Sequence, residues 1–561
     1  MTVPEQTAAS PSRPAPQHTR SEATRLLCAG VYFDSEFRRR VIEQLVEHEE
    51  RPIAPSLGID ALPVLAHALR ARRREAEIGI VLLGIWAVFI VFGLSGIGSA
   101  TFLPIPWFLA YGLVCFVPWF VRGGRGSVFP LGRAVLKEAT RGRLKAVLPV
   151  VPSAVGLLYW AAVLFTLFSG GDAWAAVFFP ALLVPPVWVH RVHIVSVMRD
   201  TLSRGAYAEA PREELPDSAS YRRIGAAIDR EQYASLAIYD PFRPFVGAGE
   251  PYKPWSLVIE LKWTPQESPE KHLDPTRGSD AGAEAGADEV PLTGREVIDL
   301  IKPRLEALRT SAAATSRDRL RSLEIDEMVF LPVGRERGHI DYDPASVRQH
   351  LDGAVGEGGE ARRHFLRVRV GAWDEQVGVS LLVRVHTQGG MLVLEVVPHV
   401  LTPVRPEFKS VDVIAAGDAA GPLRDVVRSL LTSPSAGFAA GISLLHTAVS
   451  VFRTWLTMPQ YALPDGPAAS VRELGSVKEV SLLQEMDISR YVKTLQDRIA
   501  SGVREALHTK GYEMGEFEQY IVNVSGGGVF IGEMSGGAVA TGERASAKQV
   551  DAAVDAKGGR L

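Results

Sequence analysis

Residues 78–121 read IGIVLLGIWAVFIVFGLSGIGSATFLPIPWFLAYGLVCFVPWFV, a run of 44 residues without one charge. A second run of 44 residues, 146–189, carries only Asp172. A helix of about 20 apolar residues crosses roughly 30 Å of hydrocarbon, so each run is long enough for two crossings. We therefore predict an α-helical membrane domain over residues 76–193, with four transmembrane helices near 78–97, 103–121, 147–168 and 173–192. The alternative is a set of buried helices in a large soluble protein.

The charges that flank these runs predict the orientation. The segment LRARRRE (69–75) precedes the first run, and residues 122–145 hold seven Lys or Arg against one Glu. The two predicted turns, SGIGSATFLP (95–104) and SGGDAW (169–174), contain no cation. Because cytoplasmic loops collect Lys and Arg, we predict a multi-pass protein of the plasma membrane with both termini in the cytoplasm. The lipid bilayer is then its first partner.

The N-terminal part divides into two segments. Residues 1–24 are polar and rich in proline, which predicts a disordered leader without a signal peptide. Residues 25–75 predict a helical juxtamembrane segment. In it LLCAGVYF (26–33) is a strand or the start of a helix, Asp34 caps the helix that follows, and a further helix runs from Asp60 into the first apolar run.

Beyond the apolar runs the sequence predicts a cytoplasmic α+β domain. We expect a linker at 200–220 and then the domain at 221–403, interrupted by a disordered acidic insertion at 264–291. Strand patterns occur at 255–263, 327–333, 364–373, 377–386 and 391–400, and a Gly389-Gly390 turn joins the last two. The sheet is therefore expected to be mainly antiparallel.

Helical patterns accompany and follow the sheet. The stretch TGRE (293–296) has the spacing of a capping box and opens a helix with one apolar face. Residues 404–511 predict a helical segment, in which Asp487 caps a long helix that ends before Gly511. The uncharged run 429–452 lies in this segment. We expect a helix packed on the domain or at the membrane surface, and a fifth transmembrane span is the alternative.

An aromatic loop precedes the first strand pattern of the domain. Four prolines exclude regular structure from YDPFRPFVGAGEPYKPW (239–255), and its aromatic residues alternate with Arg243 and Lys253. We considered a docking loop for a protein partner, and the alternative is a rigid loop that packs its aromatic side chains over one end of the sheet. The candidate interaction residues are Tyr239, Phe242, Phe245, Tyr252 and Trp255.

The sequence contains no motif that names a reaction. The cluster HIDYD (339–343) resembles a metal-binding motif, but Asp343-Pro344 is also an ordinary helix start. The segment HEERP (48–52) lacks the second histidine of a zinc protease, and the two cysteines, Cys28 and Cys115, predict no disulfide framework. We therefore predict no catalytic residue, no metal and no cofactor, and the charge pattern predicts no nucleic-acid partner. An enzyme acting on a lipid-linked or nucleotide substrate, and a transporter or channel, stay open as alternatives.

A ten-residue unit occurs twice near the C-terminus, in SGGGVFIGEMSGGAVATGER (525–544). The pattern of FEQYIVNV (517–524) predicts a strand before it, and glycines bound a β-prone tripeptide in each unit. We predict that residues 512–544 form a glycine-rich β repeat that pairs with identical units of other chains, through Val529, Phe530, Ile531 and Val539. The alternative is a flexible tail, as we expect for residues 545–561.

Two resemblances accompany these patterns. The stretch CAGVYFDSEFRRRVIEQLVEHEE (28–50), the four apolar segments and YDPFRPFVGAG (239–249) together resemble a group of uncharacterised actinobacterial multi-pass membrane proteins, which implies no activity. The repeat resembles the short C-terminal motifs of bacterial amyloid-signalling proteins. We expect a non-enzymatic, membrane-anchored scaffold or signalling protein with protein partners, or a homo-oligomer formed through the repeat.

Overall fold

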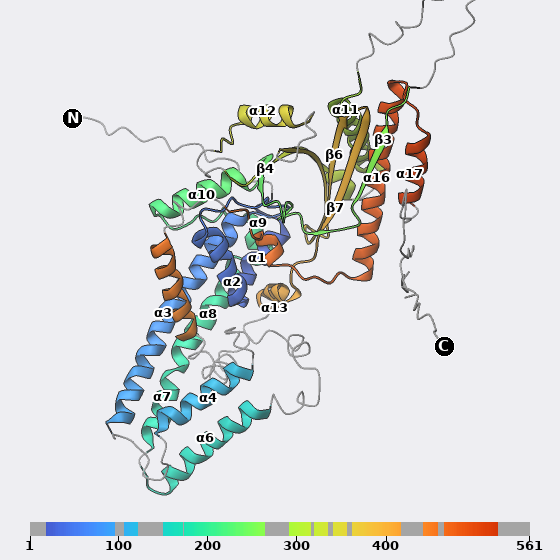
Figure 1. Cartoon of the computed structure of the whole chain (residues 1–561). Helices are drawn as coiled ribbons and strands as arrows, with labels where there is room; N and C mark the ends of the chain where they lie inside the picture. The colour runs from blue at the N-terminus through green and yellow to red at the C-terminus, as the bar shows by residue number, and fades with distance from the viewer. Residues whose placement is uncertain are drawn as a thin grey trace, which may run out of the picture.

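The computed structural model describes residues 18–95, 106–121, 150–171, 173–263, 291–315, 319–334, 340–355, 362–416, 441–457 and 465–525. Figure 1 shows apolar helices at one end of the molecule, a group of short helices in the middle and a curved sheet with its covering helices at the other end. The acidic insertion predicted after residue 263 and the repeat after residue 525 lie outside the described residues.

The apolar end is built from two long helical segments and two shorter helices. Its elements are α3 (Ala61–Leu94), α4 (Trp107–Val121), α6 (Val150–Phe168), α7 (Trp174–Leu182) and α8 (Val184–Asp200). By length and composition, Ala61–Leu94 and Trp174–Asp200 can each cross a membrane, whereas α4 and α6 are shorter apolar helices. Large apolar side chains such as Leu94, Leu157 and Phe168 are exposed on them.

The polar ends of the two long helical segments lie at Asp60 and near His190. The helix predicted to run from Asp60 is α3, and Asp60 caps it, since its carboxylate accepts a hydrogen bond from the amide of Leu62 at 3.2 Å. The fourth predicted span, 173–192, includes His190 and Arg191 of α8, and both are buried against other parts of the chain. The apolar part of this segment therefore ends before residue 190.

The middle of the molecule is one hydrophobic cluster, which we name the connecting core. It joins the first turns of α3 and the end of α8 to short helices from three distant parts of the chain. These helices are α1 (Glu22–Phe33), α2 (Ser35–Ile42), α9 (Arg204–Glu209), α10 (Ala219–Glu231), η5 (Pro406–Lys409), α13 (Ser410–Ala416) and α15 (Val471–Leu474), with the π-helical turn η1 (Glu43–Glu47) after α2. Segments before, between and after the apolar helices and the sheet thus share one core.

Two boundaries in this region correct the sequence analysis. Residues 18–24 were predicted to belong to the disordered leader, but Thr19 donates a hydrogen bond to Asp60 at 2.7 Å and Ser21 caps α1. Residues 200–220 were predicted to be a linker, but α9 lies there and Tyr207 is buried in the connecting core. In both places a few hydroxyl or aromatic groups fix a largely polar segment.

The sheet has seven strands in the order β1-β4-β5-β6-β7-β2, and β3 also pairs with β7. Its strands are β1 (Leu236–Tyr239), β2 (Glu250–Pro251), β3 (Trp255–Glu260), β4 (Glu324–Pro332), β5 (Arg363–Ala372), β6 (Val377–Gln388) and β7 (Met391–Leu401). The pair β1–β4 is parallel and the remaining pairs are antiparallel, so the sheet is mixed. Gly389 and Gly390 form the β6–β7 turn with positive φ angles, as predicted.

Helices cover one face of this sheet. They are α11 (Gly294–Thr315), α12 (Pro344–Val355) and α16 (Leu482–Thr509), with α17 (Gly515–Ser525) beside α16 and the short η3 (Arg319–Ser322) before β4 (Figure 1). Apolar residues of α11 and α16 form the main core with strands β3 and β5 to β7, and α12 packs on β1 and β4. The capping box predicted at Thr293 and Glu296 is present at the start of α11.

Two predictions on the last helices were wrong. The long helix α16 begins after Ser481, which forms a capping box with Gln484, and Asp487 lies inside the helix beside Arg490. The segment predicted as a strand, 517–524, is helix α17, because Phe517 enters the main core and Glu518 pairs with Arg504 of α16. Both contacts are tertiary and outweigh the local alternation.

Candidate functional site

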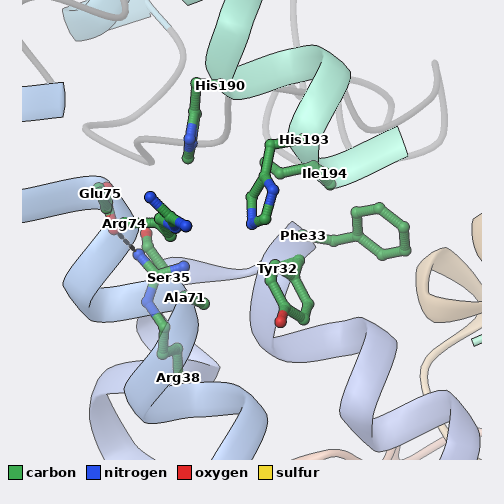
Figure 2. Close-up of a pocket in the computed structure, with 10 residues that line it drawn as sticks. All are labelled: Tyr32, Phe33, Ser35, Arg38, Ala71, Arg74, Glu75, His190, His193 and Ile194. Carbon is green, nitrogen blue, oxygen red and sulfur yellow. Dashed lines mark hydrogen bonds and ion pairs between the residues drawn. The ribbon is translucent and has the colours of Figure 1, made fainter. Parts of the chain in front are cut away.

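The polar junction between α2, α3 and α8 is the first candidate site. Figure 2 shows a small cavity there, into which His190 and His193 of α8 point from one side and side chains of α1 to α3 from the other. Its volume is about 10 Å³, which is room for about one water molecule. His190 is 9% exposed, and its Nδ1 has no hydrogen-bond partner in the described part of the chain.

Arg38 is the central charge of this junction. Its guanidinium donates a hydrogen bond to the carbonyl of Val31 at 2.9 Å and pairs with the Glu75 carboxylate of α3. Burial lowers the pKa of Arg38 to about 10, so the side chain stays charged at neutral pH. A buried ion pair is costly to break from one side, and it therefore fixes α2 against α3 at the start of the apolar region.

A larger groove opens next to this junction. Its volume is about 490 Å³, and it lies between α2, α3, the last turn of α4 and a helix formed by residues 441–457. Four arginines and four glutamates line it together with hydroxyl groups of the 441–457 helix: Arg38, Arg39, Arg72, Arg453, Glu36, Glu43, Glu47, Glu75, Ser443, Thr447 and Ser450. The opposite formal charges balance, and apolar side chains such as Ile42 and Trp119 also line the groove.

A second large cavity lies at the other end of the connecting core. It measures about 630 Å³ and lies between α10, the start of β1 and α12. Arg230 lies over the ring of Tyr342 at 5.4 Å, and Arg348 and Tyr233 also line the cavity. Arg212 and Asp229 line it as an ion pair, with 2.6 Å between Nη2 and Oδ1. Val347 and Leu351 supply an apolar wall from α12. Cavities of this size, with aromatic and cationic walls, suit a small anionic ligand with a planar ring.

Glu473 fixes the aromatic loop to the connecting core. Its Oε1 accepts hydrogen bonds from the amides of Gly247 at 2.7 Å and Gly249 at 3.1 Å, while its Oε2 completes the capping box of α15 with Ser470. Both glycines have φ near +100°, and a Cβ on Gly249 would lie 2.3 Å from the carbonyl oxygen of Val400. The loop is therefore held in one conformation that only glycine allows at these positions.

The structure separates the five candidate interaction residues of the loop region. Phe245 contacts the rings of Phe330, Phe365 and His399, and Tyr239 is buried beside Phe330. Tyr252 and Trp255 are half-buried against the main core. Phe242 alone of the five is 94% exposed. Four of these aromatic residues thus contribute to packing, and one is free to contact a partner.

The remaining candidate residues divide between described and undescribed parts of the chain. Asp341 and Asp343 are exposed, and their carboxylates accept hydrogen bonds at the start of α12, as an ordinary helix start requires. Among the described residues no group of histidine, cysteine or acidic side chains has the arrangement of a metal site. His339 and the repeat residues Val529, Phe530, Ile531 and Val539 lie outside the described residues.

Sequence reasoning missed the functional features that depend on tertiary contacts. The junction at Arg38 and His190 joins residues about 150 positions apart, and no local pattern links them. The 441–457 helix did carry a signal, because Ser443, Thr447, Ser450 and Thr454 recur at helical spacing within an apolar run.

Comparison with known proteins identifies one part of the chain. A family model described as an AbeC-like domain matches residues 254–537, just over half of the sequence. The matched part begins just before β3 and continues past α17, so it includes the curved sheet from β3 onward and the helices α11, α12, α16 and α17, but none of the apolar helices α3 to α8. Neither a curated protein nor a solved structure matches the chain. The chain belongs to the AbeC-like domain family.

Proposed function

We propose that this protein is a non-enzymatic, membrane-anchored scaffold or signalling protein, with its AbeC-like domain on the cytoplasmic side. The connecting core carries the proposal. It holds the segment before α3, the end of α8 and the C-terminal helices α13 and α15 in one cluster. The polar end of each long apolar segment therefore lies on the same side as the sheet, which is the arrangement of a soluble body fixed to a membrane by an even number of crossings.

Four crossings are the topology that we propose. The two long segments, Ala61–Leu94 and Trp174–Asp200, supply the first and the last, and the shorter apolar helices α4 and α6 supply the inner pair. The cation-rich flanks favour a cytoplasmic location for the connecting core and both termini. Exposed apolar side chains on all of these helices favour a lipid environment over water.

The proposed scaffold has two contact elements for proteins. Exposed Phe242 offers an aromatic anchor on a loop that Glu473 and its glycines hold rigid. The glycine-rich repeat beyond α17 is the second element, through which copies of the chain associate by strand pairing. Anchoring in a membrane raises the local concentration of the chains, so weak pairing suffices.

The experiment compares oligomer size in nanodiscs or mild detergent. The full chain, a chain that ends at residue 525, and the double variant Val529→Pro/Val539→Pro are measured by light scattering across a concentration series. Proline removes ladder donors, so we expect association of the full chain and its loss in both altered proteins. A truncated chain that associates as well as the full chain would exclude the repeat as an assembly element.

A second candidate function rests on the 630 Å³ cavity. Its arginines and tyrosines favour binding of a nucleotide-like anion, as a sensor or as the substrate site of a membrane enzyme. A nucleoside diphosphate is a suitable probe in calorimetry. We expect Arg230→Ala to weaken its binding at least tenfold, and Arg222→Ala, an exposed change on the same helix α10, to leave it unchanged. Equal binding by both variants would exclude this site.

A further inference from the structure

The helix at residues 441–457 has its polar and apolar sides exchanged relative to a helix on a soluble protein. The side that faces α2 and α3 carries hydroxyl groups, namely Ser443, Thr447, Ser450 and Thr454, which are half-buried. The opposite side carries large apolar groups that are all exposed: Leu445 (59%), Phe452 (60%), Trp455 (67%) and Leu456 (65%). A surface helix in water has its apolar stripe toward the protein. The outward position of the apolar side chains on the 441–457 helix therefore needs another explanation.

Two hydroxyl groups on the inward side of this helix form hydrogen bonds. Ser450 hydrogen bonds to the carboxylate of Glu47, and Thr454 donates to the carbonyl of Ser450 at 2.9 Å. The hydroxyl row faces the charged groove of about 490 Å³ along α2. Turning the helix over would bring leucine and phenylalanine against the three arginines and four glutamates that α2, η1 and α3 contribute to the groove. The observed orientation is therefore fixed by the polarity of its neighbours.

The position of the helix relates its outer side to the apolar surface of α3. It begins at Gly441, beside the exposed Leu83 of α3, within the first apolar run. It then runs along α3, as the orange helix in Figure 1, toward Glu47 of η1. The exposed apolar side thus continues the apolar surface of α3 past the level at which the charged residues Arg72 and Glu75 begin.

We infer that the outer side of the 441–457 helix is immersed in the cytoplasmic leaflet of the bilayer, with acyl chains against Leu445 and headgroups around Trp455 and Arg453. This inference rests on the proposed membrane anchoring of the chain. Tryptophan and arginine are enriched at the depth of the headgroups, and each large apolar side chain removed from water contributes about 1.5–3 kcal/mol. The helix enters one leaflet beside α3 and does not cross the membrane as a fifth span.

The test measures the surroundings of single spin labels on the full chain in phosphatidylethanolamine/phosphatidylglycerol nanodiscs. Cys28 and Cys115 are buried, and the unlabelled parent gives the background. Labels are placed at Leu445→Cys and Phe452→Cys on the outer side and at Thr447→Cys on the inner side. Val88→Cys on α3 is the lipid control and Arg222→Cys on α10 is the water control.

We expect the labels at 445 and 452 to collide with oxygen and to be protected from a water-soluble nickel chelate, as the label at 88 is. The label at 447, which faces the charged groove, should collide with oxygen less than the label at 445 does. Two results overturn the inference while label 88 still reports lipid: nickel access at 445 and 452 equal to that at 222, or protection of these labels from both quenchers, which indicates a covering second copy or chain segment. If label 88 itself reports water, the proposed anchoring fails as well.

Discussion

The carboxylate of Glu473 joins two glycine amides of the aromatic loop to the first turn of α15. Because both its oxygens are used by backbone donors, removal of this side chain leaves buried amides without partners. We expect Glu473→Ala to lower the free energy of unfolding by about 1–3 kcal/mol. Thermal unfolding in detergent measures the effect. Glu479→Ala, an exposed change in the same segment, should stay within about 0.5 kcal/mol of the parent.

Glu327 on β4 makes stability depend on pH. Burial raises the pKa of this carboxyl, but hydrogen bonds from His364 and Lys302, the charge of Lys302 and a further bond from Arg295 outweigh burial and hold the pKa well below its usual range. A carboxyl whose pKa is lower in the folded chain stabilises it above the unfolded value of about 4.3, and this contribution is lost as pH falls.

Glu327→Gln should therefore show a smaller loss of melting temperature between pH 5 and pH 3 than the parent. The exposed Glu306→Gln on α11 serves as the control and should keep the parent's full pH dependence. An identical acid profile for the parent and Glu327→Gln would show that the four-residue cluster contributes nothing to the pH dependence.

Residue-level prediction from the sequence succeeded where a single side chain has a local task. Asp34 and Thr293 cap helices as predicted, because an N-cap needs only its own next two or three residues. It failed to find the role of Glu473, whose loop partners lie more than 220 positions away. Nothing local in the Gly247-Ala248-Gly249 stretch indicates that a carboxylate of the same chain accepts hydrogen bonds from its amides.

Two helices that cover the sheet, α11 and α16, approach closely at a glycine. A Cβ on Gly502 of α16 would lie 2.7 Å from the Cα of Ile301 in α11. We expect Gly502→Ala to destabilise the protein by about 1–3 kcal/mol through overpacking, although alanine is the better helix former. In Gly205→Ala on α9 the new methyl group meets open space, so that change should be neutral or slightly stabilising. Chemical denaturation of both variants measures the difference, and a stabilised Gly502→Ala would contradict the close approach.

At the level of elements, the strands were predictable and the last helices less so. Alternation over ten residues fixes strands β5 to β7, since no helix accommodates such a run. In contrast, 517–524 satisfies both periods: Phe517, Tyr520, Ile521 and Val524 also have helical spacing. Eight residues are too few to decide between them, and the burial of Phe517 decides for α17. The start of α16 was missed although Ser481 and Gln484 have the spacing of a capping box. Leu482 and Leu483 are exposed and lie outside the apolar stripe that Ile488 begins.

For the whole molecule, the proposed topology predicts on which side of the membrane each fused reporter will lie. Fusions of a reporter that fluoresces only in the cytoplasm should be bright after residues 75, 135 and 561 and dark after residues 99 and 171. Because segments before and after the apolar helices share the connecting core, the fusions after residues 75 and 561 should give the same result. A bright fusion after 210 with a dark one after 561 would instead support a crossing within 429–452 and contradict the leaflet position inferred for the 441–457 helix.

The division of the whole chain was predictable in outline, because charge-free runs, acidic segments and alternating strands differ in composition. The joining of these parts was not. Residues 51–60 are largely buried between α10 and the sheet, and the amide of Ser56 donates to the carbonyl of Gln232 at 2.9 Å. Such a contact depends on surfaces that form only when several segments have folded. Composition therefore predicted a membrane domain separated by a linker from a cytoplasmic domain, where the structure joins both through the connecting core.

Helix α3 runs unbroken for 34 residues, from its cap in the connecting core to Leu94. At 1.5 Å per residue it is a rod of about 51 Å. It has no joint at the membrane surface, and Arg38 fastens it to α2 on the inner side. If the outer end of this rod lies in a bilayer, as we propose, a tilt of the rod displaces Asp60 and the buried segment before it. Under the proposed anchoring, α3 therefore links the outer end of the apolar helices mechanically to the connecting core.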